Sequence, residues 1–288
     1  MNVARTIAEM RQLVRRARQA GKTSGLVPTM GALHEGHMSL IDAARGDCGF
    51  VVVSIFVNPA QFGPGEDFSR YPRAPEDDLA ACRKRSADAV FMPSAEEMYP
   101  SPAPATRVVV KGLDERLCGR SRPGHFAGVC AVVAKLFNIV QPDKAYFGAK
   151  DFQQATIIRR MTTDLDFPVK VVVCPTVRER DGLAMSSRNA YLTPAERRQA
   201  PALYAALRTA AEMIRASRPP AEEVKAAVRA CLADRAPDGA IDYVEVVDPN
   251  ELTDASNTNV PVLVALAVKF GQARLIDNII VDGPGGAT

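Results

Sequence analysis

The sequence lacks the features that would place the protein in a membrane, in an oxidising compartment or on nucleic acid. Its longest apolar stretch, residues 260 to 268, is far shorter than the roughly 20 residues that a bilayer requires. Its six cysteines stand far apart without a Cys-x-x-Cys pair, which predicts reduced thiols. The net charge of +3 is too small to indicate nucleic acid or an anionic membrane as partner. We therefore expect a cytoplasmic protein that binds neither.

The composition is that of an ordinary folded protein. Hydrophobic residues make up 47% of the 288 residues and charged residues 24%. A chain of this length forms one large domain or two modest domains, each able to bury a core. The first residues follow an amphipathic helical pattern and not the charged-then-apolar pattern of a signal sequence, which agrees with a cytoplasmic location.

The first part of the chain alternates short apolar runs with helical patterns. This alternation predicts a doubly wound parallel sheet, that is, a Rossmann-like α/β domain over residues 1–176. A short extra strand is expected at residues 107–110. The expected strands of the parallel sheet are residues 25–27, 49–57, 87–92, 144–147 and 169–173.

The pattern changes after residue 176, and residues 177–288 are expected to form a smaller α+β lid domain. Thr193, Pro194 and Glu196 form a helix-start signal and predict a long helix, which Pro219-Pro220 separates from another. Three strands of an antiparallel sheet should follow, at residues 240–247, 260–269 and 273–281.

Two histidines open the helical pattern that follows the first expected strand. His34 and His37 are three residues apart and share one face of the first helical turn. A helix start offers unpaired N–H groups and the positive end of the dipole, which suit phosphate. Such a pair can also be one packed and one solvated imidazole, or a zinc site. The preceding Pro-Thr-Met-Gly turn favours nucleotide phosphate among these three alternatives.

The motif and its context resemble a known family. The element His34-Glu35-Gly36-His37 is similar to the His-x-Gly-His signature of the nucleotidyltransferase superfamily, which includes class I aminoacyl-tRNA synthetases. The longer string from residue 28 to residue 37 resembles the pantoate–β-alanine ligase family in particular. Further matching blocks follow in the family's order at residues 56–63, 122–126, 147–154 and 182–189, so the resemblance spans most of the chain.

This resemblance implies an ATP-dependent ligase. Such an enzyme condenses (R)-pantoate with β-alanine to pantothenate through a pantoyl adenylate and releases pyrophosphate and AMP. ATP would be the co-substrate together with Mg²⁺, which the family places near the equivalents of Asp77 and Asp78. Because family members are dimers, we expect a homodimer.

The resemblance also assigns residues. The expected catalytic residues are His37, His34 and Lys150. Pantoate and β-alanine would be bound by Gln61, Gln154 and Asn58. The expected ATP-binding residues are Met30, Gly31, Ala32, Leu33, His34, Glu35, Gly36, His37, Gly148, Ala149, Lys150, Asp151, Val177, Met185, Ser186, Ser187 and Arg188.

Some of these residues have plainer interpretations when taken alone. Lys150 beside Asp151 can be an exposed lysine next to a helix cap, and residues 185–188 can be a mere turn before a helix. Their similarity to family blocks favours phosphate binding. Two positions depart from the family's usual pattern, since Ala149 and Cys118 stand where glutamates are common.

Three other functions remain open at this point. A nucleotidyltransferase of the same superfamily, acting on a small phosphorylated or carboxylated metabolite, would keep the nucleotide on its product. A zinc hydrolase would use all three histidines, His34, His37 and His125. A nucleotide-binding regulator would have no turnover.

Overall fold

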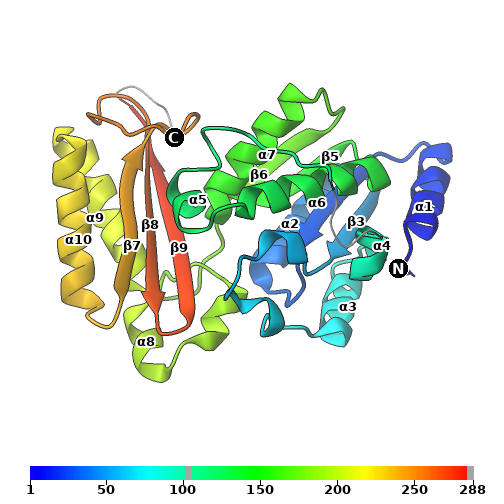
Figure 1. The fold of residues 1–288 in the computed structure, drawn as a ribbon, viewed down its shortest axis with the longest axis horizontal. Helices are drawn as coiled ribbons and strands as arrows, with labels where there is room; N and C mark the ends of the chain where they lie inside the picture. The colour runs from blue at the N-terminus through cyan, green and yellow to red at the C-terminus, as the bar shows by residue number, and fades with distance from the viewer. Residues whose placement is uncertain (101–104, 284–288) are drawn as a thin grey trace. The chain divides into compact units, whose positions relative to one another are not determined.

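The structure, a computed structural model, describes residues 1–100 and 105–283, and the chain divides into two compact units (Figure 1). The first unit comprises Met1–Glu115, Gly119–Ala149 and Gln154–Pro175, and the second comprises Arg116–Cys118, Lys150–Gln153 and Thr176–Thr288. The main junction thus falls beside the expected boundary after residue 176. The expected end of the second domain, residue 288, lies outside the described residues.

The first unit is built on a six-stranded sheet whose neighbouring strands all pair in parallel, which confirms the predicted doubly wound α/β class. The strands are β1 Asn2–Ala4, β2 Ser24–Thr29, β3 Phe50–Ile55, β4 Ala89–Phe91, β5 Lys144–Gly148 and β6 Lys170–Cys174. Their order is β1-β4-β3-β2-β5-β6. The order therefore reverses at β2, which has β3 on one side and β5 on the other. Ligands of such sheets bind at the carboxyl ends of the strands beside this switch point.

Helices cover both faces of this sheet. Val27, Val51 and Val53 pack against α2 and α3 on one face, while Leu26 and Val52 point to the opposite face and are also fully buried. Within the described ranges, none of the helices has the length and apolar character needed to cross a membrane. The helices up to residue 164 are α1 Ile7–Gln19, α2 Glu35–Asp47, α3 Pro75–Lys84, α4 Ala95–Met98, α5 Leu117–Ser121, α6 His125–Val140 and α7 Phe152–Asp164, with 3-10 turns η1 Pro59–Gln61, η2 Asp67–Ser69 and η3 Ala149–Asp151.

The second unit is an antiparallel sheet backed by helices, as predicted. Strands β7 Ala240–Val247, β8 Val262–Phe270 and β9 Ala273–Val281 pair in the order β7-β8-β9. Helices α9 Ala202–Ser217 and α10 Ala221–Arg235 lie side by side along the sheet (Figure 1). Leu203, Leu207 and Ile214 of α9 pack with Val264 and Leu266 of β8 into one core. The remaining elements are η4 Ser187–Tyr191 and α8 Pro194–Gln199.

Three local predictions were wrong. The chain start is not helical from Val3, because residues 2–4 form β1 beside β4, and the helix begins only after its Thr6 cap. Residues 107–110 form no strand. The long helix expected after Thr193 is two helices, because Pro201 has no N–H to continue the hydrogen-bond ladder of α8, and α9 begins after it.

Candidate active site

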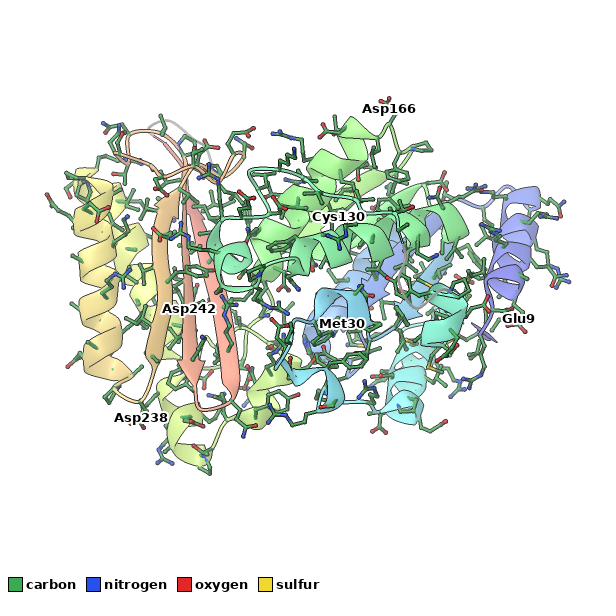
Figure 2. All side chains as sticks on the ribbon, viewed as in Figure 1. Glu9, Met30, Cys130, Asp166, Asp238 and Asp242 are labelled. Atoms are coloured by element: carbon green, nitrogen blue, oxygen red, sulfur yellow. The ribbon has the colours of Figure 1, made fainter. Side chains whose placement is uncertain are left out.

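The turn that follows β2 has an unusual backbone. Gly31 has a φ of 80° and Ala32 a φ of 49°, so two consecutive residues lie in the left-handed region. A Cβ atom at Gly31 would lie 2.9 Å from Oδ2 of Asp78, so only glycine fits there. The turn connects Met30, which directly follows β2 (Figure 2), to His34 at the start of α2.

Asp78 holds this turn in place. Its Oδ2 accepts a hydrogen bond from the N–H of Ala32 at 3.0 Å, and its Oδ1 accepts one from Leu33 at 2.7 Å. Burial raises the pKa of the Asp78 carboxyl, and these two N–H groups oppose that rise. Sequence reasoning missed this role, because Asp78 and the turn are far apart in the chain.

The expected magnesium site at Asp77 and Asp78 does not fit this geometry. Both carboxylate oxygens of Asp78 bind the backbone of the turn, and the residue is only 3% exposed. Asp77 is exposed at the start of α3. Across the described residues, no three or more His, Cys, Asp or Glu side chains are grouped so that they could hold a metal ion.

Asp78→Asn is expected to lower the free energy of unfolding by about 1–3 kcal/mol, because the amide nitrogen would face one of the two N–H donors. Urea unfolding measures this change. The matched control is Asp77→Asn, an exposed neighbour whose replacement should stay within about 0.5 kcal/mol of the parent. Equal effects of the two substitutions would contradict the role given to Asp78.

His34 and His37 cap the start of α2 reciprocally. Nδ1 of His34 accepts the N–H of Gly36 at 3.1 Å, and Nδ1 of His37 accepts the N–H of His34 at 3.3 Å. A ring nitrogen that accepts carries no hydrogen, so in both neutral imidazoles the hydrogen is on Nε2. The ring centroids are 4.1 Å apart. The cap therefore gives two adjacent rings the same tautomer, with Nε2–H as the donor.

The predicted substrate residues Asn58 and Gln61 lie together after β3. Asn58 caps η1, the turn that ends with Gln61, and Nε2 of Gln61 lies 2.9 Å from Sδ of Met30. Helix α6 approaches this turn closely, since a Cβ atom on Gly128 would lie 2.1 Å from the carbonyl oxygen of Ala60. The turn after β2 and the turn after β3 therefore meet at Met30 and Gln61.

His125 supports the same turn from α6. Its Nδ1 lies 2.7 Å from the carbonyl oxygen of Gln61, so Nδ1–H is the donor, and Nε2 can accept from Arg122 at 3.0 Å. Arg122 also forms a paired contact with Glu66. Burial raises the pKa of the Glu66 carboxyl, but the hydrogen bonds and charge of Arg122 outweigh it and leave the pKa lowered. These contacts give His125 a role in shaping the turn and exclude a three-histidine zinc site.

Lys150 and Asp151 lie in η3 and group with the second unit, while Ala149, the first residue of η3, and Gly148 before it group with the first unit. The ammonium of Lys150 is 3.9 Å from a carboxylate oxygen of Asp151. The main-chain oxygen of Lys150 accepts a hydrogen bond from the Asn278 side chain at 2.9 Å. The backbone that carries the predicted phosphate-binding lysine is therefore anchored to β9.

The glutamines of α7 have different surroundings. Gln153 is buried, accepts the N–H of Cys118 at 3.0 Å and donates to the carbonyl of Arg116 at 2.7 Å. Gln154, the predicted pantoate ligand, is half-buried in α7 of the first unit. The Cys118 sulfur contacts Tyr243 at 3.3 Å, so this departure from the family's glutamate is packed in a polar cluster.

The predicted phosphate-binding loop, residues 185–188, extends from a hairpin. Met185 donates its N–H to the carbonyl of Val177, and Arg178 pairs with Ala184 across the hairpin. Ser186 caps η4, which contains Ser187 and Arg188, by accepting the N–H of Arg188 at 3.3 Å. The hairpin therefore brings Val177 next to Met185, the first residue of the loop.

A largely buried ion pair joins this hairpin to β9. Arg178 contacts both oxygens of Asp277, at 2.6 and 3.0 Å, and its guanidinium lies 3.7 Å from the ring centroid of Tyr204. Asp277 also accepts the N–H of Asn278, the residue that holds Lys150. Within the second unit, the lysine and the loop are thus connected through consecutive contacts that the sequence pattern did not indicate.

α/β nucleotide-binding proteins bind phosphate at a helix that starts at the switch point of a parallel sheet, and α2 with its histidine cap is such a helix. Comparison with known proteins defines the class further. The chain belongs to the pantoate–β-alanine ligase family, whose family model matches residues 2–280.

Relatives and solved structures agree over almost the whole chain. The pantothenate synthetase of Moorella thermoacetica is 53% identical over 282 residues, 98% of this chain and 99% of the relative. The crystal structure of pantothenate synthetase from Thermus thermophilus is 46% identical with a TM-score of 0.91, covering 97% of this chain and 99% of that one. That of pantoate–β-alanine ligase from Francisella tularensis, complexed with β-γ ATP and β-alanine, is 34% identical with a TM-score of 0.79, covering 97% of each chain.

Proposed function

We propose that this protein is the ATP-dependent ligase that condenses (R)-pantoate with β-alanine to pantothenate. Membership of the family and the complexed Francisella tularensis relative support this reaction. The structural observation that carries it is the reciprocal histidine cap at the start of α2. It offers two Nε2–H donors and the positive end of a helix to a nucleotide phosphate.

The first step would be attack of a pantoate carboxylate oxygen on the α-phosphorus of ATP, with pyrophosphate leaving. Positioning and neutralisation of the charge on the phosphates supply most of the catalysis in such transfers. His37 would donate to the phosphate as the charge grows, with His34 beside it. Met30 and Gly31 would allow the nucleotide to approach the backbone. ATP would also be bound by the neighbouring residues Ala32, Leu33, Glu35 and Gly36.

The second unit would supply the remaining phosphate contacts. The Lys150 ammonium would stabilise the transferring phosphate, and Asp151 with Gly148 and Ala149 would border the ribose. The loop Met185, Ser186, Ser187 and Arg188 would grip the β- and γ-phosphates through its N–H, hydroxyl and guanidinium groups, with Val177 contacting the nucleotide through its backbone. Residues 177–288 would thus act as a lid that excludes water from the adenylate.

Uncharged amides would hold the acid substrate. Gln61 and Gln154 would orient pantoate by hydrogen bonds, with Asn58 in the same pocket. In the second step the amine of β-alanine would attack the carbonyl carbon of the pantoyl adenylate, and AMP would leave with the bridging oxygen. We propose a cytoplasmic homodimer, with Mg²⁺ accompanying ATP and not residing at Asp77 and Asp78.

Product analysis tests this reaction against nucleotidyl transfer. AMP and pantothenate should accumulate in equal amounts when ATP, pantoate and β-alanine are all present, and AMP should not accumulate at a comparable rate without β-alanine. A stable adenylylated product that persists when β-alanine is added would instead show a nucleotidyltransferase.

Lys150→Ala is expected to lower kcat by about 10²- to 10³-fold, with a smaller change in KM for ATP, because the ammonium would act mainly on the charge of the transition state. Steady-state kinetics with ATP as the varied substrate measures both. Lys144→Ala is the control, since it removes a lysine that pairs with Asp47 on the surface. A rise in KM for ATP that accounts for the whole loss would show that Lys150 only anchors ATP.

A further inference from the structure

All hydrogen-bonding positions of the Asn58 side chain are occupied by protein groups. Its Oδ1 accepts from the N–H of Ala60 at 3.2 Å and from the Tyr99 hydroxyl at 2.8 Å. Its Nδ2 donates to the carbonyl of Gly128 at 3.1 Å and to Oε1 of Gln61 at 3.2 Å. An asparagine amide has two acceptor sites and two hydrogens, so none is left for a substrate.

Two backbone groups determine which way this amide points. A backbone N–H can only donate and a carbonyl can only accept, so Ala60 faces the oxygen and Gly128 faces the nitrogen. The Tyr99 hydroxyl faces an oxygen without a hydrogen and must donate to it. Burial raises the pKa of Tyr99 to about 12, which keeps this donor protonated.

The orientation of Asn58 in turn determines that of Gln61. The Nδ2 of Asn58 has no lone pair, so the Gln61 atom that faces it must be the oxygen. The Gln61 nitrogen therefore faces the other way, toward Met30 at the turn after β2. Asn58 is 1% exposed and Gln61 is 8% exposed, so water does not compete freely for these contacts.

We propose that Asn58, held by the Tyr99 hydroxyl, is a positioning residue that keeps the amide nitrogen of Gln61 directed at an oxygen of the acid substrate. This inference rests on the proposed function and deepens it. The site would present hydrogen-bond donors to the hydroxyl and carboxylate oxygens of pantoate, and Asn58 would bind no substrate itself. Tyr99, which carries no other assigned role, becomes part of acid recognition.

Tyr99→Phe tests the proposal with the least disturbance. It removes one donor to Asn58 and is expected to lower kcat/KM for pantoate about 3- to 10-fold while KM for ATP stays within about 2-fold. The matched control is Tyr146→Phe in the same unit, which loses a hydroxyl contact with Asp47 at 2.9 Å and should leave KM for pantoate unchanged. If Tyr99 had only a structural role, Tyr99→Phe would change the KM values for both pantoate and ATP, or for neither.

Asn58→Asp tests the amide orientation directly. A carboxylate cannot donate, so Gln61 should rotate its nitrogen toward residue 58 and present its oxygen to pantoate. The expected loss in kcat/KM for pantoate is about 30- to 100-fold, again with KM for ATP nearly unchanged.

These measurements test the proposed function and the positioning role of Asn58 separately. If the parent enzyme forms no pantothenate, the proposed function itself is wrong. If the parent is active and Tyr99→Phe leaves kcat/KM for pantoate unchanged, or shifts the KM values for pantoate and ATP equally, only the positioning role is wrong. A folded Asn58→Asp variant with normal pantoate kinetics would also overturn it.

Discussion

His37→Asn is expected to lower the rate of adenylate formation by about 10²- to 10³-fold without a measurable change in thermal stability. The shorter amide can place an oxygen near the position of Nδ1 and so keep accepting the N–H of His34, which lies 3.3 Å from Nδ1. It cannot place a donor where Nε2–H lies. The substitution therefore separates the capping role of His37 from its proposed role at the phosphate. Single-turnover kinetics with ATP and pantoate measures the effect.

Two companion variants complete this test. His37→Gln places an amide nearer to the Nε2 position and should recover part of the rate. His37→Ala removes both roles, and should lose the rate together with about 0.5–2 kcal/mol of stability from the missing cap. Normal adenylation by a folded His37→Asn variant would show that this imidazole only caps the helix.

Asp277→Ala is expected to destabilise the second unit by about 3–5 kcal/mol, because it leaves the Arg178 guanidinium, which is only 18% exposed, without its counter-ion. Asp277 is 2% exposed and contacts Arg178 at 2.6 Å. Burial raises the pKa of the Asp277 carboxyl, and its ion pair with Arg178 opposes that rise. Hydrogen exchange of the β8 amides in the full chain measures the stability of this unit.

An exposed ion pair and a double substitution serve as controls. Arg208→Ala breaks the exposed pair with Glu212 and should cost less than about 1 kcal/mol. Arg178→Met combined with Asp277→Leu removes both charges and should recover much of the loss of Asp277→Ala. If Asp277→Ala costs no more than Arg208→Ala, the buried pair does not support the hairpin and the Lys150 backbone.

The fold class and the strand–turn–helix unit around the histidines were predictable because their signals are local. An apolar run as long as β3 must be buried on both faces, and the histidine motif follows the shorter strand β2 after a four-residue turn at residues 30–33. The helix-start signal at Thr193 was likewise visible as a short sequence pattern, and the structure contains it as a capping box with Glu196. The pattern also showed three strands in the second unit, although their pairing order needed the structure.

The supporting contacts of the site were not predictable, because they join residues far apart in the chain. Asp78 resembled an ordinary acidic residue in the first turn of a helix, yet it holds the turn at Ala32. The family resemblance assigned Asn58 to the substrate, yet its amide is satisfied by protein groups alone. Strand β1 is only three residues long and depends on β4 for its hydrogen bonds. No local propensity signals such contacts.

Pyrophosphate release before β-alanine is added tests most directly whether these groups form an acyl adenylate on the enzyme. Protein at a concentration well above the detection limit is mixed with ATP, Mg²⁺ and pantoate, and pyrophosphate is followed during the first turnover. We expect a burst of about one pyrophosphate per active site, followed by steady release only once β-alanine is supplied. The absence of any burst from active enzyme, with pyrophosphate appearing only together with pantothenate after β-alanine is added, would contradict an adenylate formed in a separate first step.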